Sequence, residues 1–465
     1  MFTFNYHYQQ YGNIHIHTTG CELSICDAKK FANTLPKDEK AIVFNTCSFL
    51  AERELENKLL LDLLVEAFPE YKLYILGCDV TNNPTNYNKY SGLVYNNDQV
   101  NEIVNPITNT DIKDNENTIY LKIQDGCRYQ CSFCIINKLR NKPYSVPYKN
   151  IIETLYNEIG DRKKVSVQLA GTELTNYYDK DNGFRIYDVL NNLIQDVPEI
   201  ETLTMTSLDP SSPDIEKILE VVNIHRNKIL PYLNLAVQSG SNTILEKMKR
   251  RHNVNRVREI HQMANINNIG LGWDIIVGFP GETEELFAET VNLIKELKPL
   301  TKTVFSYSPR KGTVAYNMPC QISDDIKKTR LKHIIKLING FMVDENIDNH
   351  MKDVYNIYNR ENLINSDINI RSNKKRVCEM LFNGYTEMEI DIFNITDFAQ
   401  FVKRPNKNCI LSIKYDIMRP LESNIYINFL KEYFKDILLV VYIPKDYDID
   451  VTEFEKYFHC VVIQK

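Results

Sequence analysis

The sequence predicts an α/β protein with an N-terminal parallel α/β sheet domain, a central partial (β/α)6 barrel, and a C-terminal domain of the α+β or α/β type. Three observations support this prediction. Strand and helix patterns alternate through the first hundred residues, restart near residue 119 for a longer run, and give way to a shorter pattern near the end. Because 465 residues exceed one ordinary hydrophobic core, we place separate domains at 1–105, 115–345 and 350–465.

The N-terminal domain is predicted from strands that are separated by helices. We expect strands at 13–19, where apolar and polar residues alternate, and at 40–46 and 72–77. Helical periodicity is found at 27–35 and, strongly, at 49–68. Strands that alternate with helices predict a parallel sheet covered on both faces.

The central domain is predicted to be an open or partial barrel, because strand and helix patterns repeat in series. The expected strands are 119–124, 165–170, 202–207, 232–238, 271–278 and 303–308. A helix is expected at 213–223, with Ser212 as N-cap and Pro213 at the first helical position. Further helices are expected at 282–297 and from about residue 328. Periodicity alone does not exclude a doubly wound sheet.

The C-terminal region follows a different pattern. TEMEIDIF, at 386–393, alternates like an antiparallel strand, and 409–465 has a compact β-α-β-α-β pattern.

Composition and charge narrow the class of protein. The chain is 43% apolar and 25% charged, as in ordinary globular proteins. A net charge of −6 argues against coating nucleic acid through an overall positive field. A local basic patch remains at 247–258, for which a solvated helix face is the alternative. We see no membrane-spanning run and no signal peptide, so a cytoplasmic protein without a membrane partner is expected. There, eleven cysteines are expected as metal ligands, catalytic groups or core residues.

Three cysteines lie close together directly after the first predicted barrel strand. Cys127, Cys131 and Cys134 have CxxxC and CxxC spacing in DGCRYQCSFC. One loop can thus present several thiolates to a metal centre, at the end of the barrel where enzymes of this architecture place their chemistry. Structural zinc is the alternative, but it needs a fourth ligand, and no His lies between His17 and His225. Three ligands fit a four-iron cluster with one open iron.

The later strands end in small, polar or Gly-rich segments that would share one rim with this loop. They are AGTE at 170–173, SLDP at 207–210, QSGS at 238–241, GFPGET at 278–283 and SPRKGT at 308–313.

The segment CRYQCSFC resembles the signature of the radical S-adenosylmethionine (SAM) enzymes. The resemblance implies that Cys127, Cys131 and Cys134 hold a [4Fe–4S] cluster whose open iron binds SAM. An electron from the cluster would cleave SAM to a 5′-deoxyadenosyl radical. The central domain would then be a radical SAM barrel.

A second set of cysteines follows the N-terminal strands. Cys21, Cys47 and Cys78 each come directly after one predicted strand. Because the carboxyl ends of parallel strands meet at one sheet edge, these thiols are expected to lie close together and to hold a second Fe–S cluster with an open iron. Three unrelated buried cysteines are the alternative. Cys26 is a possible spare ligand or a packing residue.

The segments TTGCELSICDA, FNTCSFLAERE and ILGCDV resemble the N-terminal motifs of the methylthiotransferases, a radical SAM family. In the barrel, LAVQSGSNTILEKMKRRH and DIIVGFPGETEELFAET are close to the pattern of this family. The resemblance covers roughly 13–332. It implies an enzyme that converts a C–H bond to C–S–CH₃ with two [4Fe–4S] clusters and SAM. Cys21, Cys47 and Cys78 would hold the auxiliary cluster, whose open iron carries the sulfur.

The resemblance also implies the remaining site residues and partners. All six cluster cysteines would be catalytic. The SAM pocket would involve Phe133, Gly171, Thr172, Glu173, Ser207, Gln238 and Asp274. The candidates for RNA phosphate contacts are Arg140, Arg250, Arg251 and Arg310. The implied partners are tRNA and an electron donor of the flavodoxin or ferredoxin type.

The strings SLDP, YSPRKGT and MPCQIS look most like the members that modify C2 of N6-threonylcarbamoyladenosine at position 37 of tRNA, which is the expected substrate. Isopentenyladenosine in tRNA, a protein residue, and a non-catalytic Fe–S protein are the alternatives. The sequence departs from the family at Glu173, where Asn is usual. It also departs at 353–465, which does not match the TRAM-type RNA-binding domain of typical members.

Overall fold

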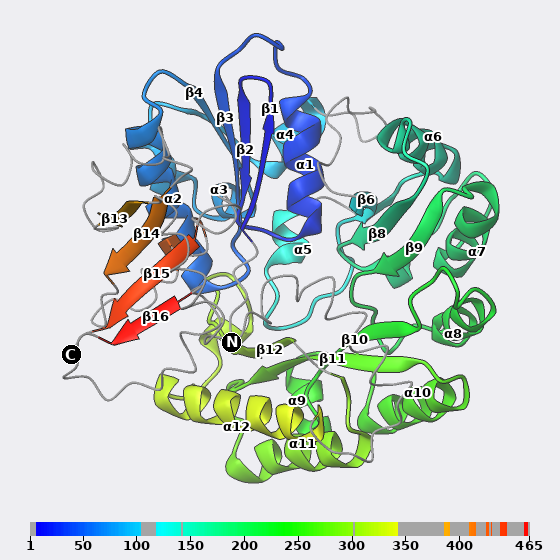
Figure 1. Cartoon of the computed structure of the whole chain (residues 1–465). Coiled ribbons are helices and arrows are strands. Elements are labelled where there is room, and N and C mark those ends of the chain that lie inside the picture. The colour runs from blue at the N-terminus through cyan, green and yellow to red at the C-terminus, as the bar shows by residue number, and fades with distance from the viewer. Residues whose placement is uncertain are drawn as a thin grey trace. The chain divides into compact units, whose positions relative to one another are not determined.

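The computed structural model describes residues 6–103, 118–140, 143–300 and 303–342, with C-terminal stretches at 386–390, 409–414, 425–426, 429, 438–443 and 460–463. The chain divides into two compact units (Figure 1). The barrel unit comprises Met1–Thr3, Ile25–Thr34 and Asn96–Tyr358. The sheet unit comprises Phe4–Ser24, Leu35–Tyr95 and Asn359–Lys465.

The sheet unit contains a sheet with the strand order β1-β2-β3-β4-β5. The strands are β1 (His7–Tyr11), β2 (Ile14–Thr18), β3 (Ala41–Thr46), β4 (Lys72–Gly77) and β5 (Leu93–Tyr95). Neighbours from β2 to β5 are parallel. β3 is buried along its whole length, as expected for a central strand covered on both faces. The predicted parallel sheet is confirmed.

The antiparallel strand β1 was not predicted. Tyr11 and Ile14 pair across a two-residue turn of Gly12 and Asn13. Gly12 has a φ of +58°, which suits such a hairpin turn. The sequence of β1, HYQQY, carries no aliphatic residue and is mostly half-buried, so its strand signal is weak.

The helices of the N-terminal part follow the strands. They are α1 (Glu22–Ala32), α2 (Ala51–Ala67), α3 (Cys78–Asn82), η1 (Pro84–Tyr87) and α4 (Asn97–Ile103). Leu60, Leu61, Leu63 and Leu64 of α2 are fully buried. Four buried residues within five positions cover more than one stripe of the helix, so α2 is not the strongly amphipathic helix that the sequence predicted.

The barrel unit has parallel strands that follow one another in sequence order (Figure 1). One group is β6 (Thr118–Asp125), β8 (Val165–Gly171) and β9 (Ile200–Met205), and the other is β10 (Tyr232–Gln238), β11 (Gly270–Val277) and β12 (Thr303–Ser306). The parallel bridges Leu203↔Ile229 and Leu208↔Leu235 join the groups. The partial (β/α)6 barrel is therefore confirmed, because a doubly wound sheet would reverse its strand order. The short strand β7 (Tyr144–Ser145), antiparallel to β6, was not predicted.

Helices cover the outside of the barrel strands (Figure 1). They are α5 (Ile136–Leu139), α6 (Tyr148–Ile159), α7 (Ile186–Asp196), α8 (Ile215–Ile224), α9 (Asn242–Lys247), α10 (Val254–Ile266), α11 (Glu284–Leu297) and α12 (Asp324–Met342), with short turns η2 (Leu174–Asn176) and η3 (Ala315–Asn317). Strands and helices share one hydrophobic core. Trp273 is fully buried in it and donates from Nε1 to His261 Nε2 at 2.9 Å.

Helix α8 begins later than predicted. Its N-cap is Asp214, not Ser212. The Ser212 hydroxyl accepts from the Asp214 backbone N–H at 3.2 Å. Ser212 therefore stabilises the turn that precedes the helix.

The C-terminal strands form a parallel sheet in the order β13-β14-β15-β16. They are β13 (Thr386–Ile390), β14 (Cys409–Lys414), β15 (Leu438–Ile443) and β16 (Cys460–Ile463). The antiparallel pairing expected for 386–393 is therefore wrong, and β13 is parallel to β14. Alternation indicates a half-buried strand but not the direction of its neighbour. Most of the helical segments expected here lie outside the described residues.

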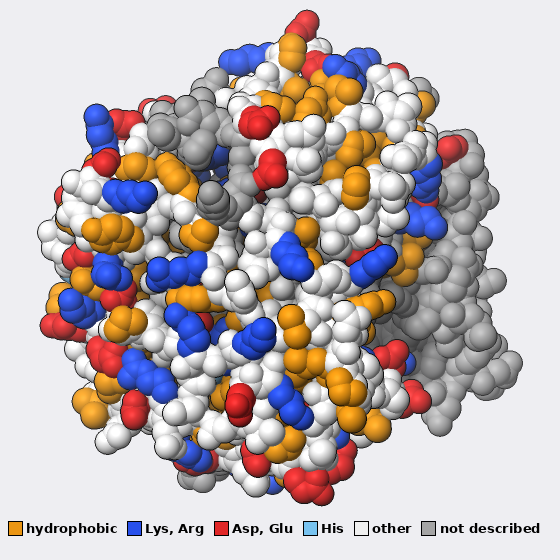
Figure 2. All heavy atoms as spheres, turned by 180° about the vertical axis from the view of Figure 1, so that it is seen from behind, with side chains coloured by type: hydrophobic (Ala, Val, Ile, Leu, Met, Phe, Trp, Pro, Cys, Tyr) orange, Lys and Arg blue, Asp and Glu red, His pale blue; other side chains and the backbone are white. Residues whose placement is uncertain are grey.

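The surface carries charges of both signs. On the face in Figure 2, Lys and Arg side chains are spread among acidic and apolar ones and form no continuous patch within the part that the structure describes, in keeping with the net charge of −6. No helix in the described ranges is long and apolar enough to cross a membrane.

Gly77 fixes the end of β4 before Cys78, and we predict that Gly77→Ala destabilises the sheet unit by about 2 kcal/mol or more. Its φ of +109° is adopted essentially by glycine alone, and an added Cβ would lie 2.4 Å from the Thr46 carbonyl oxygen. Gly12→Ala is the control, because its φ of +58° is milder and only the Lys37 carbonyl lies near, at 3.8 Å. Urea unfolding should show a clearly larger loss for Gly77→Ala. Equal losses would contradict the prediction.

Candidate functional site

The three-cysteine loop, residues 127–134, connects β6 to α5 and is fixed by backbone contacts to other barrel elements. Ser132 N donates to Met248 O at 3.0 Å, and Ser132 O accepts from Ala315 N at 2.8 Å. The Ser132 hydroxyl also donates to Lys247 O at 2.8 Å. The loop thus lies at the carboxyl ends of the barrel strands, as predicted.

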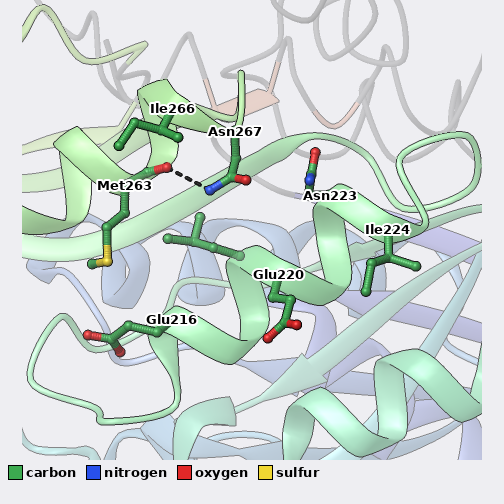
Figure 3. Close-up of a pocket in the computed structure, with 8 residues that line it drawn as sticks. Glu216, Glu220, Asn223, Ile224, Met263, Ile266 and Asn267 are labelled. Atoms are coloured by element: carbon green, nitrogen blue, oxygen red, sulfur yellow. Dashed lines mark hydrogen bonds between the residues drawn. The ribbon is translucent and has the colours of Figure 1, made fainter.

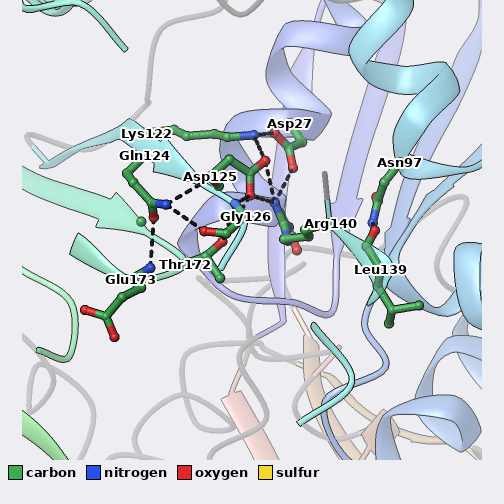
Figure 4. A network of polar contacts seen from close by, with 12 residues as sticks. Asp27, Asn97, Lys122, Gln124, Asp125, Gly126, Leu139, Arg140, Thr172 and Glu173 are labelled. Atoms are coloured by element: carbon green, nitrogen blue, oxygen red, sulfur yellow. Dashed lines mark hydrogen bonds and ion pairs between the residues drawn. The ribbon is translucent and has the colours of Figure 1, made fainter. Parts of the chain in front are cut away.

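The Asp125 carboxylate fixes both ends of this loop (Figure 4). Its Oδ1 accepts from Gly126 N at 2.8 Å where the loop starts and from Arg140 Nη1 at 3.0 Å just after α5. The same oxygen accepts from Thr172 Oγ1 at 3.0 Å, in the turn after β8. One carboxylate therefore joins β6, the loop, α5 and the next strand.

Asp125 belongs to a buried group of alternating charges within the barrel unit. Lys122 Nζ lies 2.6 Å from both Asp27 Oδ1 and Asp125 Oδ2, and Arg140 Nη1 lies 3.2 Å from Asp27 Oδ2. Burial alone would raise the pKa of Asp125, but Arg140 and Lys122 hold it well below its usual range. The carboxylate stays ionised, so loss of one cation would leave a buried charge uncompensated.

The cysteines of the loop are all half-buried. Burial raises the pKa of Cys127 to about 11 and that of Cys134 to about 12. Neighbouring thiolates act on both in the same direction. Because the thiolate is the metal-binding form and a metal cation favours it, these side chains suit metal ligation better than free nucleophilic chemistry.

Arg250 contacts one of the cysteines of the loop. Its Nη1 donates to Cys131 Sγ at 3.4 Å. Its Nη2 lies 3.2 Å from Asp209 Oδ2 and donates to Ala236 O at 2.8 Å. The side chain is 6% exposed. This guanidinium is therefore a buried charge beside the three-cysteine loop.

Glu173 is also buried in this region. Burial, and then the charge of Asp209, raises the pKa of Glu173 to about 7. Its Oε1 accepts from Thr175 N at 3.1 Å and Thr175 Oγ1 at 2.5 Å. The Glu173 backbone N–H donates to Gln124 Oε1 at 2.8 Å, which ties the turn to β6.

Among the predicted SAM-pocket residues, the structure brings Ser207 and Asp274 together through Asn234. Asn234 Nδ2 donates to Ser207 Oγ at 2.8 Å and to Asp274 Oδ1 at 2.7 Å. Burial raises the pKa of Asp274. Gln238 ends β10 with a φ of +71° and is buried. Polar groups from the segment after β9, from β10 and from β11 are thus close together in the barrel.

The other predicted pocket residues lie in the three-cysteine loop and at the end of β8. Phe133 packs against a small apolar cluster of Ile244, Met248, Ile276, Phe279, Tyr307 and Ala315. Gly171 leaves no room for a side chain, since a Cβ would lie 2.5 Å from Leu174 Cδ2. Thr172 and Glu173 follow it in the turn described above.

The four arginines expected at RNA phosphates differ in exposure, and their contacts to RNA stay a prediction. Arg140 and Arg310 are buried, at 7% and 5% exposure, and the side chain of Arg250 is 6% exposed. Arg140 and Arg250 neutralise internal carboxylates, as described above. The Arg251 side chain is exposed, as a contact with an RNA phosphate requires.

Sequence reasoning missed an aromatic group beside Arg251. The guanidinium carbon of Arg251 lies 3.4 Å from the centre of the Tyr129 ring. Tyr129 OH donates to Asn176 Oδ1 at 2.7 Å, and Arg128 Nη2 donates to the same oxygen at 2.8 Å. The strings CRYQC and TNYY contained this signal, but nothing in the sequence paired them.

The second cysteine set lies at the ends of β2, β3 and β4 in the sheet unit. Cys21 is exposed, Cys47 half-buried and Cys78 buried. Burial raises the pKa of Cys47 to about 12, and the nearby Cys21 and Cys78 thiolates act in the same direction. The structure therefore brings the set together at one sheet edge, as the strand topology predicted.

Asn57 of α2 holds these strand ends in place. Its Oδ1 accepts from Thr19 Oγ1 at 2.6 Å, and its Nδ2 donates to Cys47 O at 2.9 Å and to Asp79 Oδ2 at 3.0 Å. Tyr87 OH donates to the same carboxylate oxygen at 2.5 Å. One buried amide thus connects residues beside each of the three strand ends.

Cys26 takes no part in this set. It is buried on α1 and donates from Sγ to Tyr120 O at 3.2 Å. Of its two expected roles, the contact supports packing.

The chemistry of both donor sets, three cysteine side chains each, fits iron–sulfur clusters, which are held by Cys thiolates. Among the described residues, no three His, Cys, Asp or Glu side chains converge enough to bind one metal ion. A structural zinc ion needs four such donors. In a four-iron cluster each cysteine binds a different iron.

A hollow on the outside of the barrel unit lies between α8 and α10 (Figure 3). Its lining residues are Glu216, Leu219, Glu220, Asn223, Ile224, Met263, Ile266 and Asn267. It contains no cysteine and none of the predicted site residues.

Comparisons with known proteins find similarity to radical SAM proteins and to tRNA-modifying enzymes. The model of the Radical SAM superfamily matches residues 121–294. The chain is 29% identical over 341 residues to the threonylcarbamoyladenosine tRNA methylthiotransferase MtaB of Rickettsia prowazekii, covering 68% of this chain and 80% of that protein. It is 29% identical over 380 residues to the tRNA-2-methylthio-N(6)-dimethylallyladenosine synthase of Thermoanaerobacter pseudethanolicus, covering 72% and 79%. A solved radical S-adenosylmethionine methyltransferase, TsrM from Kitasatospora setae, gives a TM-score of 0.45 at 11% identity over 63% of this chain and 66% of that one.

We predict that Arg140→Gln lowers the free energy of unfolding by about 3–5 kcal/mol, because it leaves Asp125 and Asp27 short of a cation in a buried site. Arg258→Gln, which removes an exposed pair with Glu296, is the control and should cost at most about 1 kcal/mol.

Denaturant unfolding across pH tests the same point. Asp125 has a lowered pKa in the folded state, so its ion pairs stabilise the protein above the usual Asp value of 3.8. The gap between wild type and Arg140→Gln should be full at neutral pH and narrow only as pH falls below that value. A gap that is absent at neutral pH would contradict the assignment.

Proposed function

We propose that this chain, a member of the radical SAM methylthiotransferase family, inserts sulfur and a methyl group at C2 of N6-threonylcarbamoyladenosine at position 37 of tRNA. The observation that carries the proposal is the presence of two separate three-cysteine sets, one in each compact unit. The relative from Rickettsia prowazekii, named for this nucleoside, is matched over 80% of its length.

The cysteine sets would hold the two cofactors. Cys127, Cys131 and Cys134 would bind one [4Fe–4S] cluster, and Cys21, Cys47 and Cys78 would bind the auxiliary cluster. When bound, the clusters and SAM supply a carbon radical and a sulfur atom, which an aromatic C–H bond without an acidic proton requires. The protein contributes thiolates, buried charges and a fixed loop.

Side chains of the barrel would orient SAM. Ser207 and Asp274, joined through Asn234, offer hydroxyl and carboxylate oxygens to the ribose or amino group of SAM. Glu173 is buried near the three-cysteine loop and adds a second carboxyl group. Phe133 packs on an apolar cluster and fixes the loop beside the SAM position.

Arg251, Tyr129 and Arg128 support RNA as the substrate. Exposed guanidinium groups bind phosphates, and an aromatic ring with a guanidinium above it offers a stacking surface for an unpaired base. We expect an electron donor of the flavodoxin or ferredoxin type for the cluster, and a tRNA substrate agrees with the expected cytoplasmic location.

Dimethylallyladenosine in tRNA is the second candidate substrate. The relative from Thermoanaerobacter pseudethanolicus, named for the modification of that nucleoside, matches with the same identity over a slightly larger share of this chain. The two candidates need the same cysteine sets and differ in the group on N6 of adenosine.

We predict about eight iron atoms per chain after anaerobic reconstitution, because each of two clusters carries four. The triple variant Cys21→Ala, Cys47→Ala, Cys78→Ala should retain about four and still cleave SAM to 5′-deoxyadenosine, without sulfur insertion. Cys26→Ala is the control and should keep all the iron. A wild type with about four irons would overturn the assignment of a second cluster.

Mass spectrometry of tRNA nucleosides tests the substrate. Cells without the gene should lose 2-methylthio-N6-threonylcarbamoyladenosine. The restored wild-type gene should bring this nucleoside back, and a restored gene that encodes Cys131→Ala should not. Loss of the methylthiolated dimethylallyl nucleoside instead would select the second candidate. Unchanged levels of both would contradict a tRNA substrate.

A further inference from the structure

A buried positive charge lies directly against a cysteine of the three-cysteine loop. Arg250 donates from Nη1 to Cys131 Sγ at 3.4 Å, and its side chain is 6% exposed. The loop is held from both sides by backbone contacts of Ser132. The loop that carries Cys131 is therefore held in place where Arg250 contacts it.

Arg250 cannot turn away from the sulfur without losing other contacts. Its Nη2 lies 3.2 Å from Asp209 Oδ2 and donates to Ala236 O at 2.8 Å. Asp209 is 2% exposed, and its Oδ1 accepts from Ser211 N at 2.8 Å. The cation of Arg250 thus contacts both Cys131 and the carboxylate of Asp209, and both charged side chains are held in place.

We infer that Arg250 and Asp209 are a positioning pair that sets the reduction potential of the cluster on the three-cysteine loop. The inference rests on the proposed function, because it needs a [4Fe–4S] cluster at this loop. Hydrogen bonds to cluster sulfurs and the charge around them govern such potentials. In a buried site water screens little of that charge.

The two residues act with opposite sign. Reduction adds one electron to the [4Fe–4S]²⁺ cluster and gives [4Fe–4S]⁺, so the cluster becomes more negative. The Arg250 cation stabilises that reduced form and raises the potential, whereas the Asp209 carboxylate opposes it. The potential of the native protein therefore reflects the balance of the pair.

A redox titration followed by electron paramagnetic resonance tests this, with dithionite as the electron source. The triple variant Cys21→Ala, Cys47→Ala, Cys78→Ala serves as the background, so that one cluster gives the signal. Arg250→Gln should lower the reduced-to-oxidised ratio at least tenfold at a fixed potential, which is about 59 mV for one electron. Asp209→Asn should shift the potential upward. Arg258→Gln, which changes the net charge by the same amount on the outside of the barrel unit, should leave it unchanged.

A double variant keeps the test valid if Arg250→Gln fails to bind iron. Arg250→Gln with Asp209→Asn removes both charges, and its potential should lie below that of Asp209→Asn alone. Shifts in the same direction for both single variants, or shifts no larger than that of Arg258→Gln, would overturn the inference. Absence of any cluster in the Cys21, Cys47 and Cys78 background would instead overturn the proposed function.

Discussion

The carboxylate of Asp125 is the constraint on which the barrel site depends. A loop that presents three thiolates has no helix or sheet of its own to fix it, so its two ends must be held together by other contacts. Asp125 does this with the backbone of Gly126 at one end and Arg140 at the other, and it also reaches Thr172 on the neighbouring strand. Burial makes these contacts strong, and it also makes each cation indispensable.

The same logic recurs around the site. The barrel unit contains two further buried ion pairs. They are Arg250 with Asp209, and Arg330 with Glu282 in the segment that follows β11. In the sheet unit a neutral amide, Asn57, has the corresponding role for the second cysteine set. The segments that carry the cysteines are fixed by hydrogen bonds of neighbouring polar groups, because thiols form only weak ones.

Much of the architecture could be predicted from the sequence. The barrel strands, the parallel N-terminal sheet and both cysteine sets follow from periodicity and from the rule that parallel strands end at one edge. The parallel pairing of β13 could not be predicted, because the direction of a strand relative to its neighbour depends on the partner strand. The edge strands β1 and β7 were missed because their strand signals are weak. The roles of Arg140 and Arg250 were missed because burial of a charged side chain depends on carboxylates distant in sequence. The domain boundaries stay predictions. Residues 25–34, which lie inside the predicted N-terminal domain, cluster with the barrel unit.

The two cysteine sets differ in how far apart their members lie along the chain. Cys127 and Cys134 span eight residues of one loop, whereas Cys21 and Cys78 follow separate strands, β2 and β4, whose ends meet only in the folded sheet. Closing a short loop costs little entropy, while bringing distant segments together requires the intervening chain to fold first. The geometry of the strand-end set therefore depends on the folded sheet more than that of the loop set does. Unfolding of the sheet unit would separate Cys21, Cys47 and Cys78 from one another, whereas Cys127, Cys131 and Cys134 would stay within eight residues of one loop.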